Sequence, residues 1–170
     1  MTLTQRFARV TLEYLERCRS SALDSPGATP GWDPPEADLL DTDWALWGLV
    51  RYGRSAGADA GLVDLLDRAA SGDTTVGYLD HDDVYEGFGD PPRMLLPQAV
   101  AEVSRALDTI GLDALLAELP AGTEEAATAC GFDPGFDGDV RAYLVWHFEA
   151  LREFYRVAAG RGECVVAWTD

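Results

Sequence analysis

The C-terminal fifty residues of this chain restrict its fold more than any other segment. From Asp139 to Ala159, apolar residues recur at the spacing of one face of an α-helix, at Val140, Tyr143, Leu144, Phe148, Leu151, Phe154, Tyr155 and Ala158. Gly160 and Gly162 then predict the end of that helix. The segment Cys164–Thr169 is β-branched and aromatic, which predicts a strand. A long amphipathic helix that leads into such a strand must be part of the core.

The remaining segments predict more helices than strands, and the two do not alternate regularly. The expected elements are a strand at 3–10, helices at 11–20, 44–53, 58–70, 97–110, 112–119 and 121–129, a loop at 25–35 and an extended segment at 74–79. Asp41, Thr42 or Asp43 is expected to cap the second of these helices. We therefore expect an α+β fold, a single domain over residues 1–170 with several helices packed on a small mixed sheet.

The charge of the chain excludes several classes of function. Its formal net charge is −17, all 13 basic residues are arginine, and lysine is absent. Nucleic acid and anionic membrane are not expected as ligands, because both would repel such a chain. Without lysine there is no Schiff-base catalysis and no Walker phosphate-binding motif. No apolar run has membrane-spanning length, and the first ten residues lack the apolar core of a signal peptide, so we expect a cytoplasmic protein.

Cysteine chemistry is expected to be absent as well. An odd number of cysteines, Cys18, Cys130 and Cys164, cannot all pair, and in a cytoplasmic protein we expect free thiols. We expect no cofactor.

The most reactive-looking stretch is an acidic loop from Asp80 to Glu86. Asp80, His81, Asp82 and Asp83 offer the oxygen and imidazole ligands that Mg²⁺, Mn²⁺ or Zn²⁺ would use, and a metal there would activate water for hydrolysis. The spacing matches no specific metal motif, so a solvated acidic loop is the alternative interpretation.

Two neighbours on the long helix, Trp146 and His147, are candidate ligand-binding residues. His147 lies on the apolar face, where a buried neutral imidazole with one or two hydrogen bonds competes with a catalytic role. Trp146, Trp44 and Trp47 are interpreted first as core residues, with an interface as the alternative. Trp32, in its proline-rich loop, is the least core-like of the tryptophans.

The segment after the acidic loop predicts a small-ligand site. Gly87 and Gly89 allow close backbone approach, Tyr85 and Phe88 offer apolar walls, and Arg93 can hold an anion. The alternative is a structural turn in which Arg93 pairs with one of the many acidic residues.

Several of these motifs resemble the YfbM-like family of small bacterial proteins of unknown function. The resemblance is carried by Gly87-Phe88-Gly89, the proline-started helix after Arg93-Met94-Leu95-Leu96, the helix Phe148–Tyr155 and the short final strand. It implies the same single α+β domain and supplies no catalytic residue.

The sequence therefore favours a non-enzymatic binding or interaction module, with a basic protein as the candidate partner. The alternative is a metal-assisted, hydrolase-like enzyme that uses Asp80–Glu86. A homodimer is a further possibility that the sequence leaves open.

Overall fold

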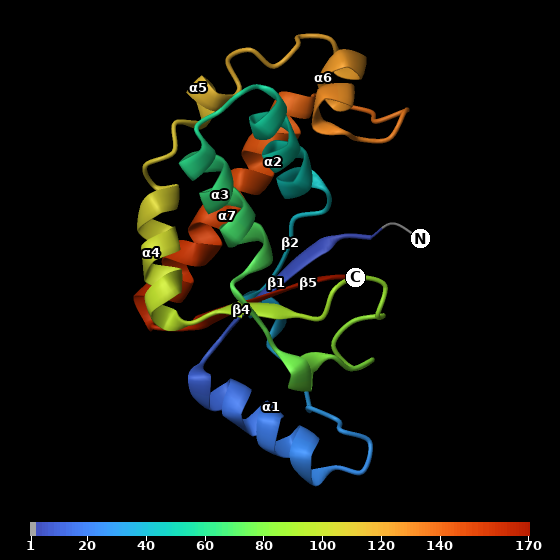
Figure 1. The fold of residues 1–170 in the computed structure, drawn as a ribbon, viewed down its shortest axis with the longest axis vertical. Helices are drawn as coiled ribbons and strands as arrows, with labels where there is room; N and C mark the ends of the chain where they lie inside the picture. The colour runs from blue at the N-terminus through green and yellow to red at the C-terminus, as the bar shows by residue number, and fades with distance from the viewer. Residues whose placement is uncertain (1–2) are drawn as a thin grey trace.

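A computed structural model describes residues 3–170 of the chain (Figure 1). Its strands are β1 (Gln5–Val10), β2 (Leu39–Asp41), β3 (Thr74–Thr75), β4 (Arg93–Leu95) and β5 (Cys164–Thr169). Its α-helices are α1 (Leu12–Asp24), α2 (Ala45–Ser55), α3 (Ala60–Ser71), α4 (Pro97–Leu107), α5 (Leu112–Leu115), α6 (Thr123–Cys130) and α7 (Val140–Arg161), and short 3₁₀ turns lie at Glu36–Asp38 and Gly77–Leu79.

The strands form one five-stranded sheet in the order β2-β1-β5-β4-β3. β1 and β5 pair with each other at the centre of the sheet, with Gln5 opposite Thr169 and Val10 opposite Cys164. The α+β class and the terminal helix and strand are confirmed. The expectation of a mixed sheet is wrong, because every pairing in the described part of the chain is antiparallel. The segment α4–α7 returns the chain so that β5 runs opposite to both of its neighbours.

Helices cover the two faces of the sheet unequally (Figure 1). α7 packs with α2 and α4 on one face, while α1 and the 3₁₀ turn Gly77–Leu79 lie on the other. Along β5, Val165 and Ala167 face the larger core under α7, and Cys164, Val166 and Trp168 face the smaller core under α1. This burial on both faces explains why the final strand has no polar alternation.

Local sequence accounts for several of the helix ends. The Thr11 hydroxyl accepts a hydrogen bond from the Tyr14 N–H at 3.0 Å, and the Asp139 carboxylate accepts one from the Ala142 N–H at 2.9 Å, so both side chains act as N-caps. Pro97 occupies the first turn of α4. Gly162, with a φ of 66°, ends α7 in the left-handed region that glycine tolerates best.

Helix α2 differs from expectation at both ends. It begins after Trp44 without a side-chain cap, so none of Asp41, Thr42 and Asp43 has the predicted capping role. It continues through Gly53 to Ser55, because Gly53 is buried against Val63 and serves close packing rather than termination.

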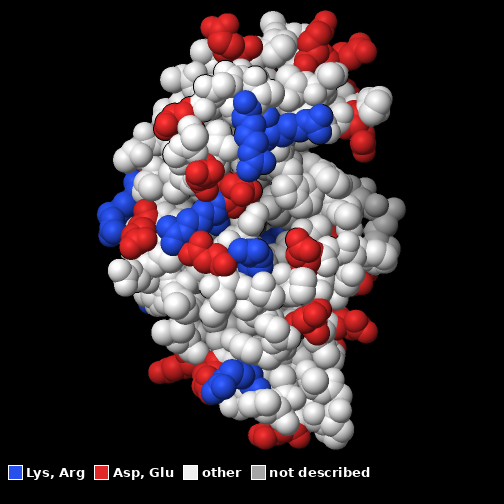
Figure 2. Space-filling view, viewed as in Figure 1, with Lys and Arg blue, Asp and Glu red and all other residues white. Residues whose placement is uncertain are grey.

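The predicted thiol state agrees with the structure. Cys18, Cys130 and Cys164 are free and buried. No helix among residues 3–170 is both long enough and apolar enough to cross a membrane. Acidic residues and arginines are interspersed over the face seen in Figure 2, so the negative charge does not form a single uninterrupted patch there.

Candidate functional site

The three residues of the predicted small-ligand site lie in different environments. Tyr85 is buried in the smaller core and donates a hydrogen bond to Asp80 at 2.5 Å; burial, with this bond, raises the pKa of Tyr85 to about 12. Phe88 is 63% exposed. Arg93 lies on β4 opposite Ala167, which faces the larger core. Arg93 is therefore on the face of the sheet opposite to the one that Tyr85 packs against. The loop thus does not present these side chains as one wall.

The predicted metal ligands are engaged with the protein itself. The His81 Nδ1 accepts a hydrogen bond from the Asp83 N–H at 3.0 Å, which leaves Nε2–H to donate to the Gly27 carbonyl at 3.2 Å. Asp80 accepts the Tyr85 hydroxyl. Within residues 3–170, no group of three or more His, Cys, Asp or Glu side chains is arranged to hold a metal ion. These hydrogen bonds hold the acidic loop, both within itself and to Gly27 in a distant loop.

Trp146 and His147 occupy opposite surroundings on α7. His147 is 6% exposed, so its expected burial is confirmed, and burial lowers its pKa below the usual value. The expected hydrogen bonds to the ring are not found: its buried Nδ1 has no hydrogen-bond partner among residues 3–170. Trp146 is 68% exposed, so its interpretation as a core residue is wrong. Its ring nevertheless meets the His147 ring edge-on, with the centroids 4.7 Å apart.

The structure forms an aromatic pocket that the sequence did not predict. We use this name for the hollow of ≈ 320 Å³ whose walls include Trp44, Phe132, Phe136 and Tyr143. It lies between the start of α2, the loop after α6 and the first half of α7, where the molecular outline is indented on the right of Figure 2. Three distant segments meet here.

The rings of this pocket pack against one another. Phe132 and Phe136 are stacked with centroids 5.1 Å apart, and both meet the Tyr143 ring edge-on, at 5.5 and 5.2 Å. Tyr143 in turn lies 4.7 Å from the His147 ring. The distances and angles are those of favourable aromatic pairs, so the wall is stiff.

Glycine makes room for this arrangement. A Cβ at Gly48 of α2 would lie 2.4 Å from the Phe132 ring, so only glycine lets that ring reach its place. Gly131, with a φ of 71°, ends α6 and turns the chain toward the pocket.

Asp43 brings a carboxylate to the aromatic wall. Its φ of 50° is unusual for a residue other than glycine. Its N–H donates to the Asp41 carboxylate at 2.8 Å, and its own carboxylate accepts the Tyr143 hydroxyl at 2.8 Å. Burial, aided by this bond, raises the pKa of Tyr143. Neither Asp43 nor Asp133, also on the pocket, has an ion-pair partner in the described part of the chain.

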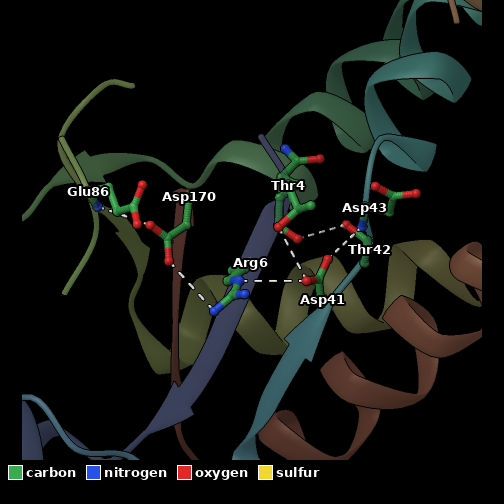
Figure 3. A network of polar contacts seen from close by, with 8 residues as sticks. Thr4, Arg6, Asp41, Thr42, Asp43, Glu86 and Asp170 are labelled. Atoms are coloured by element: carbon green, nitrogen blue, oxygen red, sulfur yellow. Dashed lines mark hydrogen bonds and ion pairs between the residues drawn. The ribbon is translucent and has the colours of Figure 1, made fainter. Parts of the chain in front are cut away.

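A polar network behind the pocket holds the Asp41–Asp43 turn (Figure 3). Asp41 accepts a hydrogen bond from the Thr4 hydroxyl at 3.2 Å and lies 3.6 Å from the Arg6 guanidinium. Arg6 also lies 3.6 Å from the carboxylate of Asp170, which accepts the Glu86 N–H at 3.0 Å. The two central strands thus anchor the turn that positions Asp43.

Sequence reasoning missed this site for identifiable reasons. Phe132 and Phe136 stand in a Gly- and Pro-containing loop, where no periodicity reveals a shared face, and Asp43 was interpreted as a helix cap. The available signal was the four-residue spacing of the two phenylalanines beside acidic residues. Chemically, aromatic faces next to an unpaired carboxylate suit a cation.

Comparison with known proteins identifies the fold but no activity. A crystal structure of YfbM from Escherichia coli, a protein of unknown function, superposes with a TM-score of 0.60 and 17% sequence identity over 96% of this chain and 98% of that one. None of the curated proteins matches the chain. The family model of a domain of unknown function, DUF1877, matches residues 1–168. The chain, predicted from its motifs to be YfbM-like, therefore belongs to the DUF1877 family.

Proposed function

We propose that this protein is a non-enzymatic binding module whose aromatic pocket receives a cationic side chain of a basic partner protein. The observation that carries the proposal is the position of Asp43. Its carboxylate stands beside the aromatic wall, bonded to a neutral tyrosine hydroxyl and without an arginine partner among residues 3–170.

The chemistry of the pocket favours arginine or lysine over an anion or a neutral ligand. A cation over an aromatic face gains about 0.5–2 kcal/mol, more as water is excluded. The two carboxylates on the pocket, Asp43 and Asp133, add attraction of the same sign. A net charge of −17 would also speed the encounter with a basic surface.

The proposal of a non-enzymatic role is supported by the state of the reactive groups. Burial raises the pKa of Cys130 and of Cys164 to about 11, which keeps both thiols protonated and poorly nucleophilic at neutral pH. The acidic loop, on which a metal-assisted hydrolase would depend, provides no metal-ligand group among residues 3–170. The enzymatic alternative therefore gains no support from the geometry.

Peptide binding tests the proposal directly. Four otherwise identical peptides should carry arginine, lysine, citrulline or glutamine at the centre of a basic sequence, with binding followed by tryptophan fluorescence and calorimetry. We expect the arginine and lysine peptides to bind, the citrulline and glutamine peptides to bind at least fivefold more weakly, and affinity to fall as salt rises.

Two variants and a control locate the interaction. Asp43→Asn keeps a side chain that tolerates positive φ and accepts the Tyr143 hydrogen bond but removes the charge, and Trp44→Ala removes one wall. Each variant should lower the affinity for the arginine peptide about threefold to thirtyfold, which corresponds to the range of cation–π energies. Trp146→Ala, an exposed tryptophan outside the pocket, should change nothing. Equal affinity for arginine and citrulline peptides would refute the proposal.

A further inference from the structure

A second, smaller cavity lies on the sheet, separate from the aromatic pocket. This Gln5–Arg93 cavity has a volume of ≈ 140 Å³, and its lining includes Gln5, Arg93, Thr169, Ser71, Trp47 and Asp90. At about 30 Å³ per water molecule, it has room for roughly four to five waters or one small organic molecule. Its lining is rich in polar side chains, whereas the aromatic pocket is walled by rings.

The strand register places Gln5 and Arg93 on the same face of the sheet. Gln5 of β1 stands opposite Thr169, and Arg93 of β4 stands opposite Ala167. Thr169 and Ala167 are two residues apart on β5, so they point to the same side of the sheet. Gln5 and Arg93 therefore flank β5 from either side, on the face covered by α2 and α3.

Gln5 presents an unused acceptor. The residue is 4% exposed, and its Nε2 donates to the Ala70 carbonyl at 3.0 Å. Because a carbonyl can only accept, this bond fixes the orientation of the amide and leaves Oε1 as the free atom. Oε1 is buried and has no hydrogen-bond partner in the part of the chain that the structure describes. Such an atom is costly to leave unsatisfied.

Arg93 presents an unused donor. Its Nη2 donates to the Asp73 carbonyl at 2.9 Å, while its Nε is buried without a hydrogen-bond partner among residues 3–170. The expected pairing of Arg93 with an acidic residue is not found: none of the ion pairs in the described part of the chain includes it. The Asp73 carboxylate is instead bonded to Arg68 at 2.7 Å.

We propose that the Gln5–Arg93 cavity binds a small carboxylate that carries an N–H or O–H donor, of the size of an amino acid or a hydroxy acid. The carboxylate pairs with the Arg93 guanidinium, which has the planar donor geometry for it. The donor of the ligand bonds to Gln5 Oε1. One small molecule thereby supplies a further partner to both residues, each of which has one buried polar atom without a hydrogen bond among residues 3–170. This site is independent of the function proposed for the aromatic pocket.

The test uses four small probes: glycolate, glycine, acetate and inorganic phosphate. Binding is followed by thermal stabilisation and by NMR shifts of the Trp47 indole, since Trp47 lines the cavity. Glycolate or glycine should bind with a dissociation constant on the order of 1 mM, the range accessible to a ligand of so few atoms. Acetate, which lacks the donor, should bind at least fivefold more weakly, and phosphate should not bind more tightly than the better of the two donor-bearing acids.

Variants of Arg93 identify the site. Arg93→Met should lower the affinity for glycolate or glycine, whichever binds the parent more tightly, at least tenfold. Arg93→Lys keeps the positive charge, so it should fold even if Arg93→Met does not. Because it lacks the guanidinium fork, it should lower the affinity for the same probe about fivefold. Arg19→Met is the charge-matched control, because Arg19 is exposed on α1 across the sheet and pairs with Glu16 at 2.7 Å; it should bind like the parent.

Each other outcome counts against the proposal. If none of the probes gives a saturable response, or if Arg93→Lys binds as well as the parent, the cavity is not the site. If acetate equals glycolate and glycine, Gln5 is not engaged, and if phosphate binds most tightly, the ligand class is wrong. Asp43→Asn should leave glycolate and glycine binding unchanged, so failure of this proposal and failure of the proposed function are distinguishable.

Discussion

Asp43 and Tyr143, a hundred positions apart in the chain, are joined by a hydrogen bond of 2.8 Å. The bond ties the turn before α2 to the first half of α7. The same tyrosine hydroxyl accepts the Trp44 N–H at 3.2 Å, so one side chain holds both the carboxylate and the backbone next to the aromatic pocket. The wall of the candidate site is thus also a link between distant parts of the fold.

This link predicts a difference between two variants of Asp43. Asp43→Ala should lower the free energy of unfolding by about 1.5–3 kcal/mol, because alanine tolerates positive φ poorly and cannot accept the tyrosine hydrogen bond. Asp43→Asn keeps both properties and should cost less than about 1 kcal/mol. Urea denaturation measures both. Equal losses would mean that neither the backbone conformation nor the hydrogen bond contributes at this position.

Two helix glycines should respond oppositely to alanine. Gly48→Ala forces a Cβ to within 2.4 Å of the Phe132 ring, so we expect a loss of about 1–3 kcal/mol from overpacking together with loss of arginine-peptide binding. Gly160→Ala, in α7 with no atom within 4 Å of the new Cβ, should gain roughly 0.5–1 kcal/mol from helix propensity and bind peptide normally. If Gly48→Ala keeps full stability, Phe132 is free to move and the pocket is not rigid.

Stability should fall in mild acid through His147. Burial lowers its pKa in the folded protein below the usual 6.5, so the unfolded chain takes up the proton first as the pH drops. The contribution is present above about pH 6.5 and is lost as the pH falls through the folded pKa. NMR titration of the imidazole should give a value below 6.5. Replacement by phenylalanine should flatten the stability profile in that pH range, whereas an unchanged profile would locate the acid sensitivity elsewhere.

The three thiols should not react with a thiol reagent in the native protein. Cys18, Cys130 and Cys164 are free and buried, and burial raises the pKa of each. A thiol reagent at pH 8 should label none of them within minutes, and should label all three in denaturant without reductant. Rapid labelling of the folded protein would reveal local opening, and consistent loss of two labels would reveal a disulfide.

The parts of the fold that sequence reasoning predicted are those with strong local signals. The run Cys164–Thr169 is a strand with those bounds, and α7 differs from its predicted range by only a few residues, because periodicity and β-branching are properties of the segment itself. β2 and β4 were missed. Each has three residues and exists because a long neighbouring strand pairs with it, which is a tertiary effect.

The candidate site shows the same limit more sharply. His147 was identified as a buried imidazole because its helix position defines its face, whereas its contact with Tyr143 beside Phe132 and Phe136 depends on how a loop folds back. Arg93 was chosen for its chemistry, but Gln5, which lines the same cavity, could not be, since the two residues come near one another only through the order of strands in the sheet.

The pairing of β1 with β5 determines when the sheet can be completed during synthesis of the chain. β1 leaves the ribosome first of all the strands, yet the strand that covers it, with Cys164 opposite Val10, is made last. At about 5–20 residues per second, the roughly 150 residues between them take about 8–30 s to be translated. Throughout that interval the centre of the sheet has an open edge, protected only by whatever shields nascent chains in the cell. The helices can form during this interval, but the sheet is complete only after β5 has been made.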